Sequence, residues 1–175
     1  MTITRRAESM IGMRVLEPMI QMARETPPGC FVEVGVYKGG SAQLLHEVAV
    51  EQGRRLYLYD TFTGIPFKDS IDSHIVGDFN DTDIDQVREV APTAIIVQGI
   101  FPESIVAMGL IAFAHIDCDQ YRSVLDCCII LGPMMVPGGV MWFDDWECLD
   151  GATAAIKEIF EGRIEEIAGK GVVRF

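Results

Sequence analysis

The sequence has no excess of positive charge. It carries 14 Lys and Arg against 26 Asp and Glu, which gives a formal net charge of −12 at pH 7. A chain this acidic repels nucleic acid and anionic membranes unless it has a local basic patch. Its paired arginines, Arg5-Arg6 and Arg54-Arg55, are each flanked by other residue types and do not build one. The composition therefore predicts neither a nucleic-acid nor a membrane partner.

The sequence also lacks paired-cysteine motifs, an apolar leader and an unbroken apolar run. The 5 cysteines follow no C-x-x-C or histidine-spaced pattern, and their odd number favours a reduced, cytoplasmic protein. The N-terminus, MTITRRAESM, has no apolar core of the kind a signal peptide needs, so we expect none. The longest apolar stretch, 124–143, is interrupted by an aspartate, two prolines and a Gly-Gly pair, which predicts helix, turn and strand rather than a membrane span.

What the sequence does contain is an alternation of strand and helix patterns. Apolar runs typical of buried strands lie at 30–36, 55–60, 94–99, 110–119 and 138–146, with shorter candidates at 163–169 and 171–175. Helical patterns lie at 5–24, with Pro18 kinking or dividing it, at 41–53, after a cap at Asp81 or Thr82, at 121–135 and at 152–160. This order predicts an α/β fold: a Rossmann-like open, mostly parallel seven-stranded sheet with helices on both faces.

We expect a single domain over residues 1–175, with an N-terminal helical segment at 1–29 and a Rossmann-like core at 30–175. The hydrophobic N-terminal helix raises the further expectation of a homodimer. The polar connection 61–83 is long for a compact domain, and such loops are usually functional.

Chemically active residues follow the predicted strands. They are Gly35 to Ser41, Asp60, Gly99, Asp117 with Asp119, and Asp144 with Asp145. Because the carboxyl ends of parallel strands share one rim of the sheet, we expect these residues to lie close together.

The first of these features is a glycine turn, E-V-G-V-Y-K-G-G-S, from Glu33 to Ser41. Glycines let a backbone turn tightly against a ligand, and the helix that follows offers unpaired N–H groups. The spacing is neither G-x-G-x-x-G nor a P-loop, so a plain structural turn is an equal alternative. Asp60 ends the next strand, where an acid accepts hydrogen bonds from ribose hydroxyls, and it favours a nucleotide-like cofactor.

The second feature is an acidic group, Asp117, Asp144 and Asp145. Carboxylates brought this close raise one another's pKa unless a cation is bound, and oxygen ligands favour Mg²⁺ over zinc. The alternative is a set of exposed loop acids with Asp119 as a helix cap. His115 shares the face of Asp117 and is more typical of a packed core histidine than of a base, whereas Trp146 either walls a flat substrate or packs on the surface.

The sequence resembles the class I S-adenosylmethionine-dependent methyltransferases, and more narrowly the macrocin O-methyltransferase family, which methylates sugars of macrolide antibiotics. The segments that carry the resemblance are FVEVGVYKGGSA, YDTFTGIP, GDFNDTDIDQVRE, VQGIFPESI, HIDCDQYRSVLD and PGGVMWFDDW, which together cover most of residues 31–146. The glycine turn also resembles that of catechol O-methyltransferase, a Mg²⁺-dependent enzyme of this fold.

The resemblance implies a function and a set of site residues. The implied contacts to S-adenosylmethionine are Glu33, Gly35, Tyr37, Gly39, Gly40, Ser41, Asp60, Thr61, Phe62, Gly99 and Asp117. Asp117, Asp144 and Asp145 match the Mg²⁺ ligands, and Asp117 and Asp144 are the candidate catalytic residues, with Asp117 as the base for an acceptor hydroxyl. The segment before the first strand is shorter than in the macrolide enzymes, so a sugar or a smaller molecule remains open as the acceptor.

Three alternatives stay open at this point. The first is a metal-independent methyltransferase of the same fold, with the acids as walls of the pocket. The second is a nicotinamide-dependent oxidoreductase, which the missing G-x-G-x-x-G disfavours. The third is a non-catalytic nucleotide-binding domain, since a fold alone does not guarantee activity.

Overall fold

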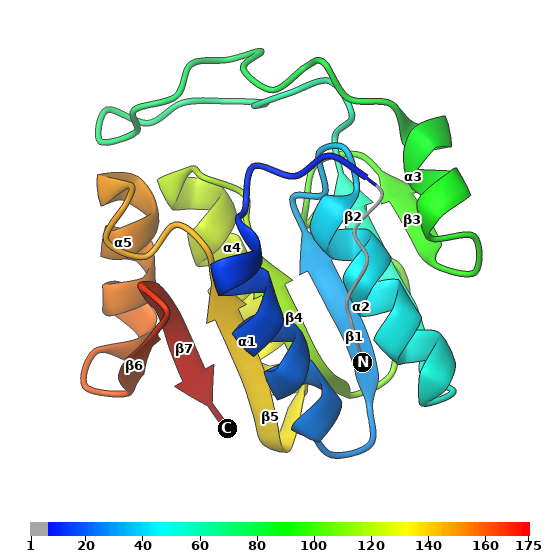
Figure 1. Cartoon of the computed structure of the whole chain (residues 1–175). Helices are drawn as coiled ribbons and strands as arrows, with labels where there is room; N and C mark the ends of the chain where they lie inside the picture. Colours follow the sequence, from blue (N-terminus) through cyan, green and yellow to red (C-terminus); the bar gives the residue numbers. More distant parts are fainter. Residues whose placement is uncertain (1–6) are drawn as a thin grey trace.

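The computed structural model describes residues 7–175, in which strands and helices alternate from β1 to β3 and again from β4 to β6 (Figure 1). The helices are α1 (Met13–Glu25), α2 (Gly40–Glu51), α3 (Ile84–Val90), α4 (Tyr121–Leu131) and α5 (Asp150–Phe160), with a 3-10 turn, η1, at Gly132–Met134. The strands are β1 (Cys30–Val34), β2 (Leu56–Asp60), β3 (Ile95–Gln98), β4 (Ile111–Ile116), β5 (Met135–Phe143), β6 (Ile164–Ile167) and β7 (Lys170–Arg174).

These strands form a 7-stranded sheet in the order β3-β2-β1-β4-β5-β7-β6. The strands from β3 to β5 run parallel, β7 is antiparallel to β5, and β6 is antiparallel to β7. The chain leaves β1 in one direction along the sheet and later returns to place β4 on its other side. Ligands of open α/β sheets bind at such a reversal, beyond the carboxyl ends of the strands. The topology confirms the predicted fold class.

Two hydrophobic cores lie on the two faces of the sheet. On one face, side chains such as Phe31, Phe113 and Trp142 pack against α1 and α2. On the other face, the alternate residues, among them Val32 and Phe143, pack against α4 and α5. Successive side chains of a strand point to opposite faces, so strands buried on both sides read as the nearly continuous apolar runs seen in the sequence. The helices thus hold the strand ends in a fixed layout.

Several boundaries differ from the predictions. The first helix begins at Met13, the described residues before it are not helical, and Arg5 and Arg6 of the predicted helix lie outside the described residues. The helix continues through Pro18, which costs it one backbone hydrogen bond without ending it. The predicted helix 121–135 ends at Leu131 and is followed by η1, and β5 begins at Met135 rather than at residue 138.

The predicted cap of the third helix was also wrong. Asp83 caps α3 by accepting a hydrogen bond from the Asp85 backbone N–H. Asp81 and Thr82 instead contact the glycine turn, with the Thr82 hydroxyl donating to the carbonyl of Tyr37.

Nothing in residues 7–175 forms a helix long and apolar enough to cross a membrane.

Candidate active site

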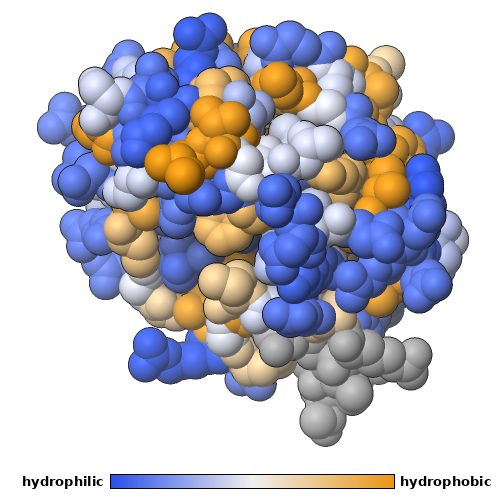
Figure 2. Space-filling model, turned by 90° about the horizontal axis from the view of Figure 1, so that it is seen from above, coloured by the Kyte–Doolittle hydropathy of each residue, from blue (hydrophilic) through white to orange (hydrophobic). Residues whose placement is uncertain are grey.

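A cavity of about 360 Å³ opens beyond the carboxyl ends of the central strands, on the face seen from above in Figure 2. Ten of the predicted site residues line it: Gly35, Tyr37, Gly40, Ser41, Asp60, Thr61, Gly99, Asp117, Asp144 and Asp145. Three others, Glu33, Gly39 and Phe62, are not part of its lining. The fold therefore brings most of the predicted residues to one place from strand ends that are far apart in sequence.

The glycine turn between β1 and α2 makes one wall of the cavity. Gly35 has a φ of 89°, and a Cβ on it would lie 1.7 Å from the backbone oxygen of Asp117. The main chains after β1 and β4 therefore approach too closely for any side chain at this position. Gly39, with a φ of 85°, directly precedes α2 and shapes the turn rather than facing the cavity. The glycines fix where the turn lies, and the open N-terminus of α2 follows it.

Asp60 fastens this turn to the end of β2. Its Oδ2 accepts hydrogen bonds from the backbone N–H groups of Val36 (2.7 Å) and Tyr37 (2.9 Å), and its Oδ1 accepts one from that of Phe62 (2.7 Å). A carboxylate has about four acceptor sites, so three internal bonds leave about one for a ligand in the cavity. The predicted bond to a ribose is compatible with this arrangement and remains a prediction.

Glu33 and His115 form a pair below the cavity. They lie side by side on β1 and β4, and the His115 Nδ1 is 2.7 Å from the Glu33 Oε1 with both side chains fully buried. His115 is thus packed in the core, as its pattern favoured. Trp146 is likewise buried in the core of the α4–α5 face and does not line the cavity. Burial separates Glu33 from the cavity that it was expected to line.

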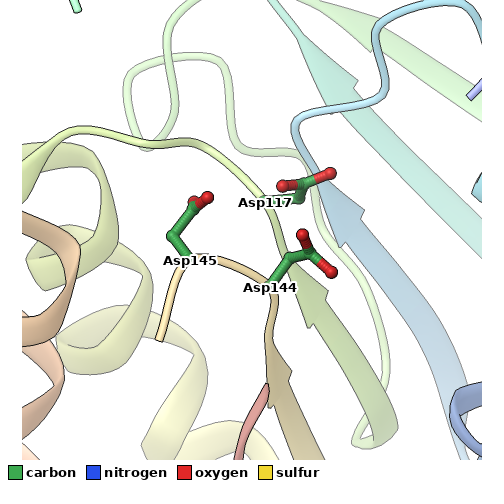
Figure 3. Close-up of side chains that lie close together, drawn as sticks. All are labelled: Asp117, Asp144 and Asp145. Carbon is green, nitrogen blue, oxygen red and sulfur yellow. The ribbon is translucent and has the colours of Figure 1, made fainter. Parts of the chain in front are cut away.

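The acidic group gathers at the ends of β4 and β5. One carboxylate oxygen from each of Asp117, Asp144 and Asp145 lies within 4.8 Å of the others. Figure 3 shows the three side chains projecting from neighbouring strand ends into the space beyond the sheet. Both adjacent aspartates of the FDDW segment follow the last residue of β5, Phe143, so neither is forced into the sheet.

The electrostatics of this group reflect burial and mutual repulsion. Burial, followed by the charges of Asp144 and Asp145, raises the pKa of Asp117 well above its ordinary value. Burial and the charge of Asp144 raise the pKa of Asp145 to about 6. Burial and the charge of Asp145 raise the pKa of Asp119 to about 8. The group therefore resists ionisation unless positive charge is added.

One positive charge is supplied by Lys170, the first residue of β7. Its Nζ lies 2.8 Å from the Asp144 Oδ2 and 2.5 Å from the Asp144 backbone oxygen. The Oδ1 of Asp144 is buried and has no partner among the described residues. Sequence reasoning missed Lys170, because a residue from an antiparallel strand at the far end of the chain has no fixed spacing to the acids. The crowding of the carboxylates, which favours a nearby positive charge, was the one signal in the sequence that could have pointed to it.

Two further segments contribute to the cavity, and only the second of them was predicted to be functional. Residues 7–12 run from α1 across the strand ends toward α2, and Glu8 to Ile11 contribute to the lining (Figure 1). The loop 61–83 passes above the strand ends (Figure 1) and is fixed to α4, because Asp72 accepts a hydrogen bond from the Tyr121 backbone N–H (2.8 Å). The long loop was predicted to be functional, and Ile65, His74 and Phe79 of this loop line the cavity.

A seven-stranded sheet of this order, with a glycine turn after β1 and acids after β4 and β5, defines the class I methyltransferase fold. Residues 2–166 match the model of the macrocin-O-methyltransferase (TylF) family. The chain belongs to this family, which confirms the predicted resemblance and the predicted enzyme class, an S-adenosylmethionine-dependent methyltransferase.

The chain is also similar to individual proteins, and the solved structures among them share its fold. The chain is 29% identical over 198 residues to 8-demethyl-8-(2,3-dimethoxy-alpha-L-rhamnosyl)-tetracenomycin-C 4'-O-methyltransferase of Streptomyces olivaceus, covering 95% of this chain and 74% of the relative. The solved structure of the O-methyltransferase NovP matches with a TM-score of 0.82 at 21% identity, covering 97% of this chain and 82% of that chain. An SAH-bound methyltransferase of Podospora anserina matches with a TM-score of 0.64 at 14% identity, covering 95% of this chain and 80% of that chain.

Proposed function

We propose that this methyltransferase transfers a methyl group to a hydroxyl of a sugar or another small molecule, and that Asp117, Asp144 and Asp145 hold a Mg²⁺ ion beside that hydroxyl. The observation that carries the proposal is the position of the acidic group in the same cavity as the glycine turn. A relative in Streptomyces olivaceus is named as a 4'-O-methyltransferase of a rhamnosyl-bearing compound, which supports a sugar hydroxyl as the acceptor.

The residues present fit a hard divalent cation. Their donors are carboxylate oxygens, the ligand type that Mg²⁺ prefers. The buried, unpartnered Oδ1 of Asp144 is costly without a ligand, since a buried acceptor that makes no hydrogen bond loses its hydration without compensation. Three ionised carboxylates with the Lys170 ammonium carry a net charge of −2, which one divalent ion neutralises.

The residues of the chain would then divide the work. Bound Mg²⁺ would lower the pKa of a coordinated hydroxyl, and the sulfonium of the cofactor supplies the methyl group. The glycine turn and Asp60 would hold the cofactor at the β1–β2 side of the cavity, while Asp144 and Asp145 would hold the acceptor side at the end of β5. Asp117 lies between these two sides and would accept the proton of the hydroxyl. Holding the two reacting atoms in line supplies much of the rate enhancement in such transfers.

Calorimetric titration tests the proposal. S-adenosylmethionine should bind to the purified protein, and Mg²⁺ should bind saturably to the cofactor complex. Turnover should then be assayed on a panel of glycosides and vicinal diols with and without EDTA. Activity that survives complete removal of metal would overturn the Mg²⁺ proposal while leaving methyl transfer in place.

One observation favours the second candidate, a metal-independent methyltransferase. Lys170 already compensates one carboxylate of the acidic group at 2.8 Å. In that mechanism Asp117 would act as the base without a metal, and EDTA would leave the rate unchanged.

The proposed homodimer and cytoplasmic location rest on the sequence alone and are tested by sedimentation and by cell fractionation.

A further inference from the structure

Lys170 orients the carboxylate of Asp144. Its ammonium donates to the Oδ2 of Asp144 and to the backbone oxygen of the same residue, so it grips both the side chain and the main chain at the end of β5. With Oδ2 held, the free oxygen Oδ1 is buried. Asp145 likewise has one hydrogen-bonded carboxylate oxygen, because its Oδ2 accepts a hydrogen bond from the Asp119 backbone N–H at 3.0 Å. Each of these two aspartates therefore has one oxygen fixed by the protein.

Lys170 is also positioned to stay charged inside the site. Its side chain is 14% exposed, that of Asp144 is 11% exposed, and Lys170 lines the same cavity as the acids. The Asp144 carboxylate, 2.8 Å from the Lys170 Nζ, pairs with the positive charge of the ammonium group. A fixed positive charge at this place repels any cation that enters the acidic group, and it repels a trivalent ion more than a divalent one.

We propose that Lys170 is a positioning residue that presents the Oδ1 of Asp144 to a metal ion and, by leaving the acidic group with a net charge of −2, makes the site select a divalent cation. This inference rests on the proposed function, since it assigns a role at the Mg²⁺ site proposed above. It adds a residue from β7 to a site otherwise built from the ends of β4 and β5.

Ion selectivity tests the inference with a readout that does not depend on turnover. Mg²⁺ binding is measured by calorimetry and Tb³⁺ binding by luminescence, on the full chain saturated with S-adenosylhomocysteine. Lys170→Gln keeps a hydrogen-bond donor for Asp144 but removes the charge, Lys170→Met removes both, and Lys170→Arg keeps the charge. Lys157→Met is the matched control, because the Lys157 Nζ lies 5.3 Å from the centre of the Trp146 ring, outside the cavity lining.

Lys170→Gln should raise the affinity for Tb³⁺ relative to that for Mg²⁺ by about tenfold or more. The repulsion that the ammonium exerts is proportional to the charge of the ion, so its removal favours the trivalent ion more than the divalent one. Lys170→Met should shift the ratio in the same direction, while Lys170→Arg and Lys157→Met should stay within about threefold of the parent chain. Bound S-adenosylhomocysteine reports on folding in every variant, and Lys170→Gln serves as the test if Lys170→Met fails to bind it.

An unchanged ratio in Lys170→Gln, with Mg²⁺ still bound by the parent chain, would overturn the role of Lys170 and leave the proposed function intact. A parent chain that binds S-adenosylhomocysteine but neither Mg²⁺ nor Tb³⁺ would overturn the Mg²⁺ site, and the role of Lys170 with it. The two failures are therefore distinguishable.

Discussion

The two sides of the cavity satisfy their polar groups in different ways. On the β1–β2 side, Asp60 accepts hydrogen bonds from three backbone N–H groups, and the glycine turn is closed against the backbone of Asp117. On the β4–β5 side, one oxygen from each of three carboxylates lies within 4.8 Å of the others, and the buried Oδ1 of Asp144 has no partner among residues 7–175. Both carboxylate oxygens of Asp60 therefore have protein partners on the first side, whereas the Oδ1 of Asp144 has none on the second.

This difference predicts opposite effects of mutation. A change on the β1–β2 side removes interactions that the fold itself uses, so it should lower the free energy of unfolding. A change in the acidic group removes mutual repulsion, so it should cost less stability while removing activity, and a change of Asp117, whose side chain has no protein partner among the described residues, should raise stability. Functional sites commonly retain strain or repulsion that lowers stability, because activity depends on it.

The largest effect should come from Gly35→Ala. The new Cβ would lie 1.7 Å from the Asp117 oxygen, so β1 and β4 would have to separate at the cavity. We expect the free energy of unfolding to fall by about 4 kcal/mol or more, with loss of cofactor binding. Urea denaturation and calorimetry measure both effects. Gly53→Ala is the control: its φ of 64° is also positive, but nothing lies within 4 Å of its added Cβ, so a cost of about 1 kcal/mol is expected.

The next effect concerns catalysis rather than folding. Asp144→Asn removes the charge of a proposed metal ligand, and we expect kcat to fall by about 100- to 1000-fold. Affinity for S-adenosylmethionine should stay within about twofold, because the turn and Asp60 are untouched. Stopped assays and calorimetry on the same preparation separate the two quantities. Loss of cofactor affinity together with folding would instead identify Asp144 as a structural acid of the β5 end.

A smaller loss of stability should follow from Asp60→Asn. An amide offers one acceptor oxygen in place of two, so one of the N–H groups of Val36, Tyr37 or Phe62 would lose its partner. We expect a loss of about 1–3 kcal/mol in the free energy of unfolding and weaker cofactor binding. Asp83→Asn, which changes the cap of α3 outside the cavity lining, should be nearly neutral because Asn caps helices as well as Asp does. Equal effects of the two substitutions would contradict the anchoring role of Asp60.

The two sides also differ in how much of them the sequence predicted. The alternation of apolar runs and helical patterns predicted the sheet, and the strand-end rule brought Asp60, Asp117, Asp144 and Asp145 to one rim. These are consequences of chain periodicity. The use of Asp60 as an anchor for the turn and the burial of Glu33 against His115 depend on how strands β1, β2 and β4 align, which no spacing within one segment reveals.

The elements that sequence reasoning missed come from the parts of the chain with the least regular pattern. Lys170 reaches Asp144 only because β7 folds back antiparallel to β5. Residues 8–11 line the cavity, and their backbone lies against Gly40, where an added Cβ would be 2.3 Å from the Cβ of Ser9. A helix was predicted over 5–24 because apolar residues such as Met10, Met13 and Leu16 have helical spacing, but helix α1 begins only at Met13. Tertiary packing overrode a local pattern at this point.

The smallest expected effect is a gain in stability on the β4–β5 side of the cavity, from the substitution Asp117→Asn. The Asp117 carboxylate accepts no hydrogen bond from the other described residues, and burial with the charges of Asp144 and Asp145 raises its pKa. A raised pKa means that the folded state holds the proton more tightly than the unfolded state, so ionising this group costs stability as the pH rises. Asp117→Asn should therefore stabilise the metal-free protein by about 1 kcal/mol at about pH 8 and by less at about pH 5. Thermal unfolding in EDTA measures the gain, with Asp126→Asn, which breaks a surface pair with Arg122, as the control that should lose stability or stay unchanged. Saturating Mg²⁺ should make the parent chain more stable than Asp117→Asn, because only the parent chain keeps all three proposed ligands. If Asp117→Asn is less stable than the parent chain already in EDTA, Asp117 stabilises the fold by contacts of its own. The contrast between the two sides of the cavity would then not hold.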